Sequence, residues 1–426
     1  MPAPTPAAIS TQFKGKKNVP TLQKRLCNKD LISNAGINSL NLFKKVIFAL
    51  TLLLRSELCG DVSHEYLRAA VPQELLPAVL ALSRYHNIPH IAADALEHHD
   101  IISDDRLSSA FKREKLLSIC RYERISHELA RLESALDEAG IYFMPLKGAA
   151  LRDFYPLPRM RSSSDIDLLV RPSQLDAAVE TVTSALSARK ISVGTHDVKL
   201  ITSIGVPVEL HFSLIENAPA VDAVFSRVWE ESVSDTAVPH KQVMSAELCC
   251  IYLILHTAKH FRHGGCGMRP IMDLWVLRER VGFDEKAVKT QLQSCGLQKF
   301  HESLNSLCDV WFKGMEHDPL TESTALYICS AGANGSVENR VAGARRLTGK
   351  HSYAARRVFL PYDLLAEQYP VLKKRRYLTS LYQIRRWVRI IKEGGTKSAL
   401  RELRTNRRLS QTRLDTVAAL YNSLGL

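Results

Sequence analysis

The segment that most constrains this chain is an apolar run carrying two carboxylates two residues apart, Asp165-Ile166-Asp167-Leu168-Leu169-Val170. Its composition predicts a buried strand. Side chains alternate between the faces of a strand, so Asp165 and Asp167 should share one face while Ile166 points into a core. Two carboxylates on one face repel each other unless a cation lies between them. A hard divalent ion such as Mg²⁺, completed by substrate phosphates, removes that repulsion. The alternative interpretation is a strand whose polar face is only hydrated.

The residues around this strand predict the other parts of a phosphate site. Residues 141–144 predict a short buried strand, Lys147-Gly148 predicts a turn, and the following residues have helical composition. A strand, a glycine turn and a helix start present free backbone N–H groups to a phosphate. Downstream, Glu209 lies in a predicted strand over 206–214 and would add a third carboxylate. Together these elements suggest a two-metal phosphoryl-transfer site.

These blocks resemble the nucleotidyltransferases of the polymerase-β superfamily. The closer resemblance is to a poorly characterised bacterial nucleotidyltransferase family with a Leu-Lys-Gly-Ala-Ala-Leu turn, an Asp-Ile-Asp-Leu-Leu-Val strand and an Asp-Leu-His-Trp strand. The matching blocks are 146–151, 161–170, 209–212, 256–260 and 272–275, and the resemblance covers about residues 80 to 390. Ser164, Glu209 and Phe212 depart from the family, which has Gly, Asp and Trp there.

The resemblance implies a metal-dependent enzyme that transfers a nucleoside monophosphate from an NTP to an acceptor and releases pyrophosphate. It implies that Asp165, Asp167 and Glu209 are catalytic and bind Mg²⁺ or Mn²⁺. The expected phosphate-binding residues are Lys147, Gly148, Arg161 and Lys259, and the further expected cleft residues are His211, His256, His260 and Asp273. The sequence leaves the NTP open, and also the acceptor, which could be a small molecule, sugar, peptide, protein or RNA.

The histidines of residues 256–263 recur at helical spacing in a helix predicted to start at Ser245. His-x-x-x-His resembles a zinc protease helix, but Thr257 stands where the general base Glu would be. Because this block belongs to those that resemble the family, the resemblance implies that the stripe faces the cleft. The alternative is a polar helix flank in which His256 bonds a neighbour such as Asp273.

The net charge of +13 is concentrated near the C-terminus. Residues 340–408 hold 19 Lys and Arg against four acids, a net charge of +15, so the remainder is slightly acidic. Such a surface attracts nucleic acid, anionic lipid or a phosphorylated substrate, or is a solvated helical surface. Two alternative functions therefore stay open. One is a nucleic-acid- or partner-binding protein with a basic helical tail, and the other is a catalytically inactive nucleotidyltransferase-like binding module.

Cysteine usage and hydropathy indicate a cytoplasmic protein without a transmembrane segment. The nine cysteines include no Cys-x-x-Cys pair, which is typical of reduced thiols. The longest apolar run, residues 46–54, is too short to span a bilayer.

The expected fold class is α+β, with a small mixed β-sheet nucleotidyltransferase core flanked by N-terminal helices and a larger C-terminal all-helical domain. The expected domains are a disordered leader 1–28, a helical region 29–140, a catalytic core 141–240 and a C-terminal helical domain 241–426 with the basic tail. Residues 108–138 have the strongest 3.6-residue period. Single helices are also expected over 217–231, 373–392 and 398–419. The helix over 373–392 is amphipathic and basic, and we expect it to pack on the helical bundle with its arginines outward; the alternatives are that it lies on a membrane surface or binds a partner.

Overall fold

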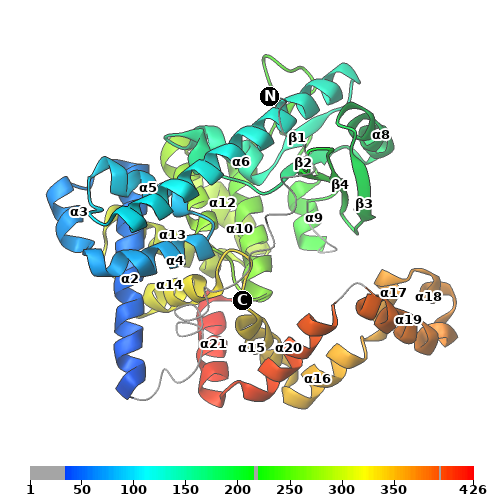
Figure 1. Ribbon diagram of the computed structural model, residues 1–426. Helices are drawn as coiled ribbons and strands as arrows, with labels where there is room; N and C mark the ends of the chain where they lie inside the picture. Colours follow the sequence, from blue (N-terminus) through cyan, green and yellow to red (C-terminus); the bar gives the residue numbers. More distant parts are fainter. Residues whose placement is uncertain (1–33, 215–218, 393–394) are drawn as a thin grey trace, which may run out of the picture.

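The computed structural model describes residues 34–214, 219–392 and 395–426, so the expected leader lies outside the described residues. The chain is α+β, as expected: a small mixed sheet lies between helices (Figure 1). The sheet order is β1-β2-β5-β4-β3; β2 and β5 are parallel and every other pair is antiparallel. The strands are β1 Phe143–Pro145, β2 Ile166–Val170, β3 Arg189–Val193, β4 Asp197–Ile201 and β5 Pro207–His211.

One face of the sheet is apolar and packs on two helices, α6 (Asp105–Glu138) and α8 (Leu175–Ala185). Alternate residues of β2 and β5, such as Ile166 and Leu210, enter this core with Leu132 of α6. The strong helical period therefore predicted α6 correctly. The helix starts earlier than expected because the Asp104 side chain accepts a hydrogen bond from Leu107 N at 2.6 Å and caps it. The polar residues of the same strands must occupy the other face.

Helices from both ends of the chain share a second, larger core. It joins Leu50 and Ile91 from the N-terminal side with Leu255, Phe300 and Tyr421 from the C-terminal side. The division into domains stays a prediction. These helices are α2 Asn34–Cys59, α3 His64–Ala70, α4 Leu76–Tyr85, α5 Pro89–His98, α10 Ala246–Arg262, α11 Arg269–Val276, α12 Glu285–Ser294, α13 Gln298–Lys313, α14 Pro319–Ala331 and α21 Gln411–Leu424.

Shorter elements connect these parts. The helix expected over 217–231 is α9, Pro219–Phe225, which ends earlier than predicted. Residues 215–218 lie outside the described residues. The remaining short elements are α7 Lys147–Leu151, β6 Val233–Ser234, β7 Gln242–Val243, the 3₁₀ helices η3 Gln73–Leu75, η4 Arg152–Phe154, η5 Pro158–Met160, η6 Pro172–Gln174 and η8 Arg376–Leu378, and the π-helix η7 Leu277–Val281.

The basic segment forms a chain of helices that extends away from the sheet (Figure 1). The expected single helices over 373–392 and 398–419 are wrong. The first breaks at Arg375, whose φ of −135° is not helical, and the second at Leu409, after which Ser410 caps a new helix. The helices are α15 Val337–Thr348, α16 Lys350–Val358, α17 Tyr362–Gln368, α18 Val371–Lys374, α19 Thr379–Lys392 and α20 Thr396–Arg408.

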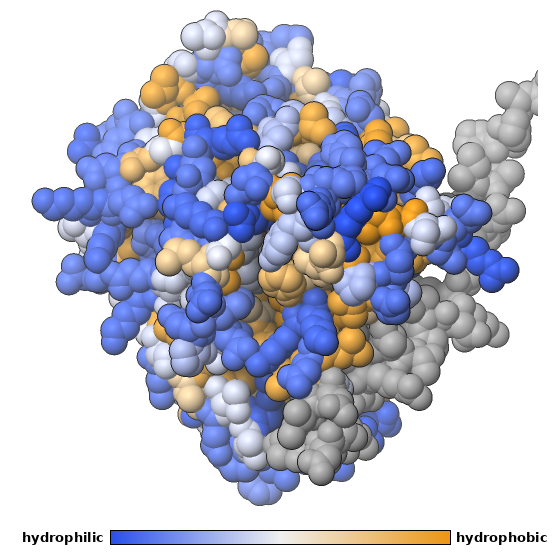
Figure 2. Space-filling model, turned by 90° about the vertical axis from the view of Figure 1, so that its left-hand side faces the viewer, coloured by the Kyte–Doolittle hydropathy of each residue, from blue (hydrophilic) through white to orange (hydrophobic). Residues whose placement is uncertain are grey.

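Within the described ranges, no helix combines the length and the apolar character needed to cross a membrane. The face on the left of Figure 1 is seen directly in Figure 2. Hydrophilic residues predominate on it, with smaller hydrophobic areas between them. Scattered exposed apolar side chains of this kind are usual on a globular surface.

Candidate active site

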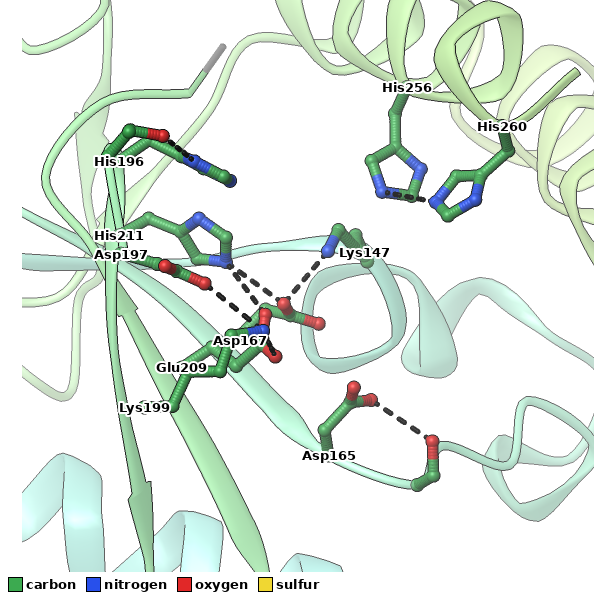
Figure 3. A network of polar contacts seen from close by, with 12 residues as sticks. Lys147, Asp165, Asp167, His196, Asp197, Lys199, Glu209, His211, His256 and His260 are labelled. Carbon is green, nitrogen blue, oxygen red and sulfur yellow. Dashed lines mark hydrogen bonds and ion pairs between the residues drawn. The ribbon is translucent and has the colours of Figure 1, made fainter. Parts of the chain in front are cut away.

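The polar face of the sheet gathers two carboxylates and an imidazole (Figure 3). Asp167 of β2 lies opposite Glu209 of β5, so both side chains project from the same face. His211 follows two residues later on β5 and projects the same way. Ligand atoms of Asp167, Glu209 and His211 all lie within 4.8 Å of one another. Parallel pairing of β2 and β5 thus brings together residues from separate sequence blocks.

We call Asp167, Glu209 and His211 the acid cluster. Two lysines neutralise its carboxylates. Lys147 Nζ donates to Asp167 Oδ1 at 2.9 Å, and His211 Nε2 lies 3.0 Å from the same oxygen. Lys199 of β4 lies opposite Glu209, and its Nζ is 2.5 Å from Glu209 Oε1 and 3.3 Å from Asp197 Oδ2. Sequence reasoning missed Lys199 and Asp197, although their spacing of two in a strand indicates a shared face.

The pKa of Asp167 shows that the surrounding cations outweigh burial. Burial alone would raise the pKa of this carboxyl, but hydrogen bonding to His211 and the charge of Lys147 hold it well below its usual range. Burial likewise opposes the charged form of Lys147, yet neighbouring Tyr252 and Asp167 raise the pKa of its ammonium group. Asp167 is therefore a buried carboxylate that keeps its charge.

Asp165 lies just before β2 and outside the tight cluster. Figure 3 shows it on the same side of the sheet as Asp167, with Ser164 Oγ donating to its Oδ1 at 3.4 Å. Burial and the nearby charge of Asp167 raise the pKa of Asp165. The two carboxylates thus differ: Asp167 already has cationic partners, whereas Asp165 would be stabilised by an added cation.

The Lys147-Gly148 turn is tightly constrained. Lys147 has a φ of +50°, a left-handed conformation that costs a non-glycine residue about 1 kcal/mol or more. A Cβ on Gly148 would lie 2.0 Å from Ser163 Oγ and 3.1 Å from an Arg161 guanidinium nitrogen. Gly148 therefore lets the segment before β2 pack onto the turn. Helix α7 has only five residues, so its dipole offers little to a phosphate.

Arg161 and Asp273 form a buried ion pair that joins the segment before β2 to α11. Arg161 Nε and a terminal guanidinium nitrogen donate to Asp273 at 2.6 and 2.9 Å, and Tyr155 Oη donates to the same carboxylate at 2.7 Å. Asp273 therefore partners Arg161, and the alternative that it bonds His256 is wrong. A phosphate-binding role for Arg161 stays a prediction.

Sequence reasoning gave no role to Arg269, the first residue of α11. Its guanidinium donates to Ser162 O at 2.9 Å, beside the Arg161–Asp273 pair and close to Asp165. Burial, followed by repulsion from Arg161, lowers the pKa of Arg269 to about 10. Among the described residues it makes no ion pair. Nothing in the sequence separates it from the other 56 of the chain's 57 Lys and Arg residues.

The histidines of α10 face the site from the opposite side (Figure 3). The Nε2 atoms of His256 and His260 lie 3.2 Å apart. Burial, followed by the positive charge of Lys147, lowers the pKa of His256 well below its usual range and that of His260 to about 4. Both rings are neutral at pH 7. Within the described ranges they belong to no group of three metal ligands, and Lys259, half-buried between them, stays a predicted phosphate contact.

A cavity of about 230 Å³ lies farther along the same sheet face. Leu169 lines it and lies opposite His211, two pairs along the strands from Asp167 and Glu209 and therefore on the same face. Three aromatic side chains, Phe212, Phe225 and Trp229, also line it. The cavity can therefore accept an apolar or planar group beside the acid cluster.

The family described as "Uncharacterised nucleotidyltransferase" matches residues 73–313. The matched region runs from η3 to α13 and includes the whole five-stranded sheet and α10. No curated protein matches the chain significantly. Because the match spans more than half of the 426 residues and contains the acid cluster, this protein belongs to the uncharacterised nucleotidyltransferase family.

Proposed function

We propose that this protein is a metal-dependent nucleotidyltransferase that transfers a nucleoside monophosphate from an NTP to an acceptor. Family membership supports nucleotidyl transfer in general. The observation that carries the finer proposal is the pairing of Asp167 with Glu209 beside His211, because it concentrates anionic oxygen ligands on one face. In the reaction, an acceptor oxygen would attack the α-phosphorus, the α–β phosphoanhydride bond would break, and pyrophosphate would leave with its electron pair.

The residues present fit a divalent ion. Asp165, Asp167 and Glu209 would hold Mg²⁺ or Mn²⁺, with the His211 imidazole beside them, because carboxylates are the ligands that these hard ions prefer. His211 Nδ1 is buried without a hydrogen-bond partner among the described residues, so this imidazole is incompletely satisfied. When bound, the ion would lower the pKa of the attacking group and stabilise the charge of the transition state.

The cationic side chains would orient the triphosphate. Lys147, now paired with Asp167, would contact phosphate oxygens when the divalent ion takes over its neutralising role. Arg269 would bind the leaving pyrophosphate next to Asp165, since it forms no ion pair among the described residues. The neutral rings of His256 and His260 would border the acceptor. The cavity at Leu169 is the proposed space for its bulk.

Thermal unfolding with each of ATP, CTP, GTP and UTP, with and without Mg²⁺, tests this proposal. We expect a Mg²⁺-dependent rise in Tm with at least one nucleotide in wild type, lost in Asp165→Ala/Asp167→Ala. Asp176→Ala, at an exposed acid of α8, is the matched control and should keep the shift. Pyrophosphate release is then measured with the nucleotide that binds. No shift with any nucleotide would contradict the proposal.

The second candidate is an inactive nucleotidyltransferase-like binding module. The observation that favours it is that Lys147 and Lys199 already neutralise Asp167 and Glu209. In that case nucleotide would bind equally well with and without Mg²⁺. The same thermal measurements would then give shifts insensitive to the ion, and pyrophosphate would not be released.

A further inference from the structure

Helix α19 presents its apolar side chains to solvent and buries an arginine. Leu381, Ile384 and Ile391 are 58%, 63% and 62% exposed, whereas Arg386 is 6% exposed. The expectation that the arginines of this helix all face outward is therefore wrong. A soluble helix normally turns its apolar stripe inward, so this reversed orientation calls for a physical reason.

The contacts of Arg386 and Tyr382 hold the helix in this orientation. The Arg386 guanidinium donates to the carbonyl oxygens of Val358 at 3.3 Å and Arg357 at 3.2 Å, at the end of α16. Tyr382, one turn earlier on the same side, lies 5.0 Å from the Tyr369 ring and packs on the small core of α17 and α18. With these residues turned inward, the 100° step per residue points the apolar stripe outward.

The exposed apolar side chains form one continuous surface. Val388 completes the stripe, which then has the spacing i, i+3, i+7 and i+10 from Leu381, and Trp387 lies next to it. Phe359, at the end of α16, is 65% exposed with its ring centroid 6.1 Å from that of Trp387. Contiguous exposed apolar surface marks an interaction site. We call this surface the outer patch; its residues are Phe359, Leu381, Ile384, Trp387, Val388 and Ile391.

The charge around the outer patch defines the kind of partner. Residues 371–392 contain eight Lys and Arg and no Asp or Glu. Arg385, Arg389 and Lys392 are exposed and follow one edge of the stripe at 100° per residue. The partner must therefore combine negative charge with an apolar phase. Nucleic acid supplies the charge, but it has no apolar phase for Leu381, Ile384 and Ile391.

We propose that α19 binds the surface of an anionic lipid bilayer, lying in the plane of the interface. The outer patch enters the boundary between headgroups and acyl chains, and the flanking basic side chains contact anionic headgroups. Trp387 lies at the edge of the patch, an aromatic position typical of such interfaces. The helices α17 to α19 lie at the extremity of the molecule in Figure 1, on the side away from α2, which leaves the helix accessible to a flat surface. This inference does not rest on the proposed enzymatic function.

Co-sedimentation of the full chain with vesicles tests the proposal. We expect binding to vesicles of phosphatidylcholine with 30% phosphatidylglycerol, roughly tenfold or more tighter than to phosphatidylcholine alone and weakened by salt. Trp387 emission should shift to the blue on binding, and Trp387→Phe should remove that change. Ile384→Glu/Ile391→Glu and Arg385→Glu/Arg389→Glu should each weaken binding about tenfold or more.

The control is Leu116→Glu/Val193→Glu, at two apolar residues of other surfaces with similar exposure, 62% and 61%. It should bind vesicles like wild type. Circular dichroism checks that each variant keeps its helices. Absence of binding to the anionic vesicles, or equal binding by Ile384→Glu/Ile391→Glu, would overturn the proposal. Two other results would also overturn it. One is tight binding to single-stranded RNA that is unchanged in Ile384→Glu/Ile391→Glu. The other is self-association of the wild-type protein that this variant loses, with no binding to vesicles.

Discussion

Asp167 and Glu209 lie opposite each other on the parallel strands β2 and β5, and each is neutralised by a lysine from a different segment. This pairing makes Asp167 the centre of the site. Asp167→Asn preserves the shape but removes the charge that Lys147 and His211 contact. We expect Mg²⁺-dependent nucleotide binding to be lost and pyrophosphate release to fall by roughly a hundredfold or more. Isothermal titration and a pyrophosphate assay measure these effects. Full NTP-dependent turnover in this variant would remove the core of the proposal.

Arg269 should affect nucleotide affinity rather than folding. Its guanidinium has one backbone partner and no ion pair among the described residues, so Arg269→Ala leaves no carboxylate unpaired. We expect nucleotide binding to weaken by about 10-fold or more, with the Tm of the free protein changed little. Arg262→Ala, at an exposed arginine of α10, is the control. If both variants bind nucleotide like wild type, Arg269 does not contact the phosphates.

Asp273→Ala should destabilise the protein strongly. It leaves the buried Arg161 guanidinium and the Tyr155 hydroxyl without their carboxylate partner. Removing one member of a buried ion pair costs about 3–5 kcal/mol of unfolding free energy. Urea denaturation of Asp273→Ala, Arg161→Met and the double variant measures this cost. Losses that simply add in the double variant would show that the pair is not coupled.

Gly148→Ala tests the close packing of the turn. The new Cβ would collide with Ser163 Oγ, so the segment before β2 must shift or the hydroxyl must rotate. We expect a loss of about 1–3 kcal/mol of unfolding free energy. Gly148→Ala/Ser163→Ala removes the colliding oxygen and should recover part of that loss. No recovery would place the strain in the backbone of the turn instead.

Acid should destabilise the protein partly through His90. Its Nε2 lies 3.0 Å from Met160 O, and burial lowers its pKa from 6.5 to about 4. Because the folded state binds this proton less tightly than the unfolded state, stability is full above pH 6.5 and falls as the pH approaches 4. The whole contribution is about 3 kcal/mol.

His90→Gln removes that titration while keeping a hydrogen-bond donor. Between pH 7 and pH 5, the unfolding free energy measured with urea should decrease less in the variant than in wild type. Because the two proteins are compared by this pH-dependent decrease, any loss of packing energy that is the same at both pH values cancels. Equal decreases would mean that His90 is not neutral in the folded protein.

Local sequence determined the elements that carry the site. Alternation along residues 165–170 correctly predicted that Ile166 is buried and that Asp167 faces away from the core. The 3.6-residue period predicted α6, and the Lys147-Gly148 pair predicted a turn. These features depend on contacts within a few residues, which the chemistry of neighbouring side chains is sufficient to define.

Tertiary structure decided what those elements face. The Arg161–Asp273 pair spans 112 positions, and the partners Lys199 and Lys147 reach the acid cluster only after the strands pair. Tertiary structure also decided the orientation of α19. Its sequence predicts an apolar stripe but not whether that stripe faces the protein or the solvent. The carbonyls at the end of α16 hold Arg386 inward and turn the stripe outward. A periodic pattern defines the two faces of an element, whereas the choice between them depends on partners distant in the chain.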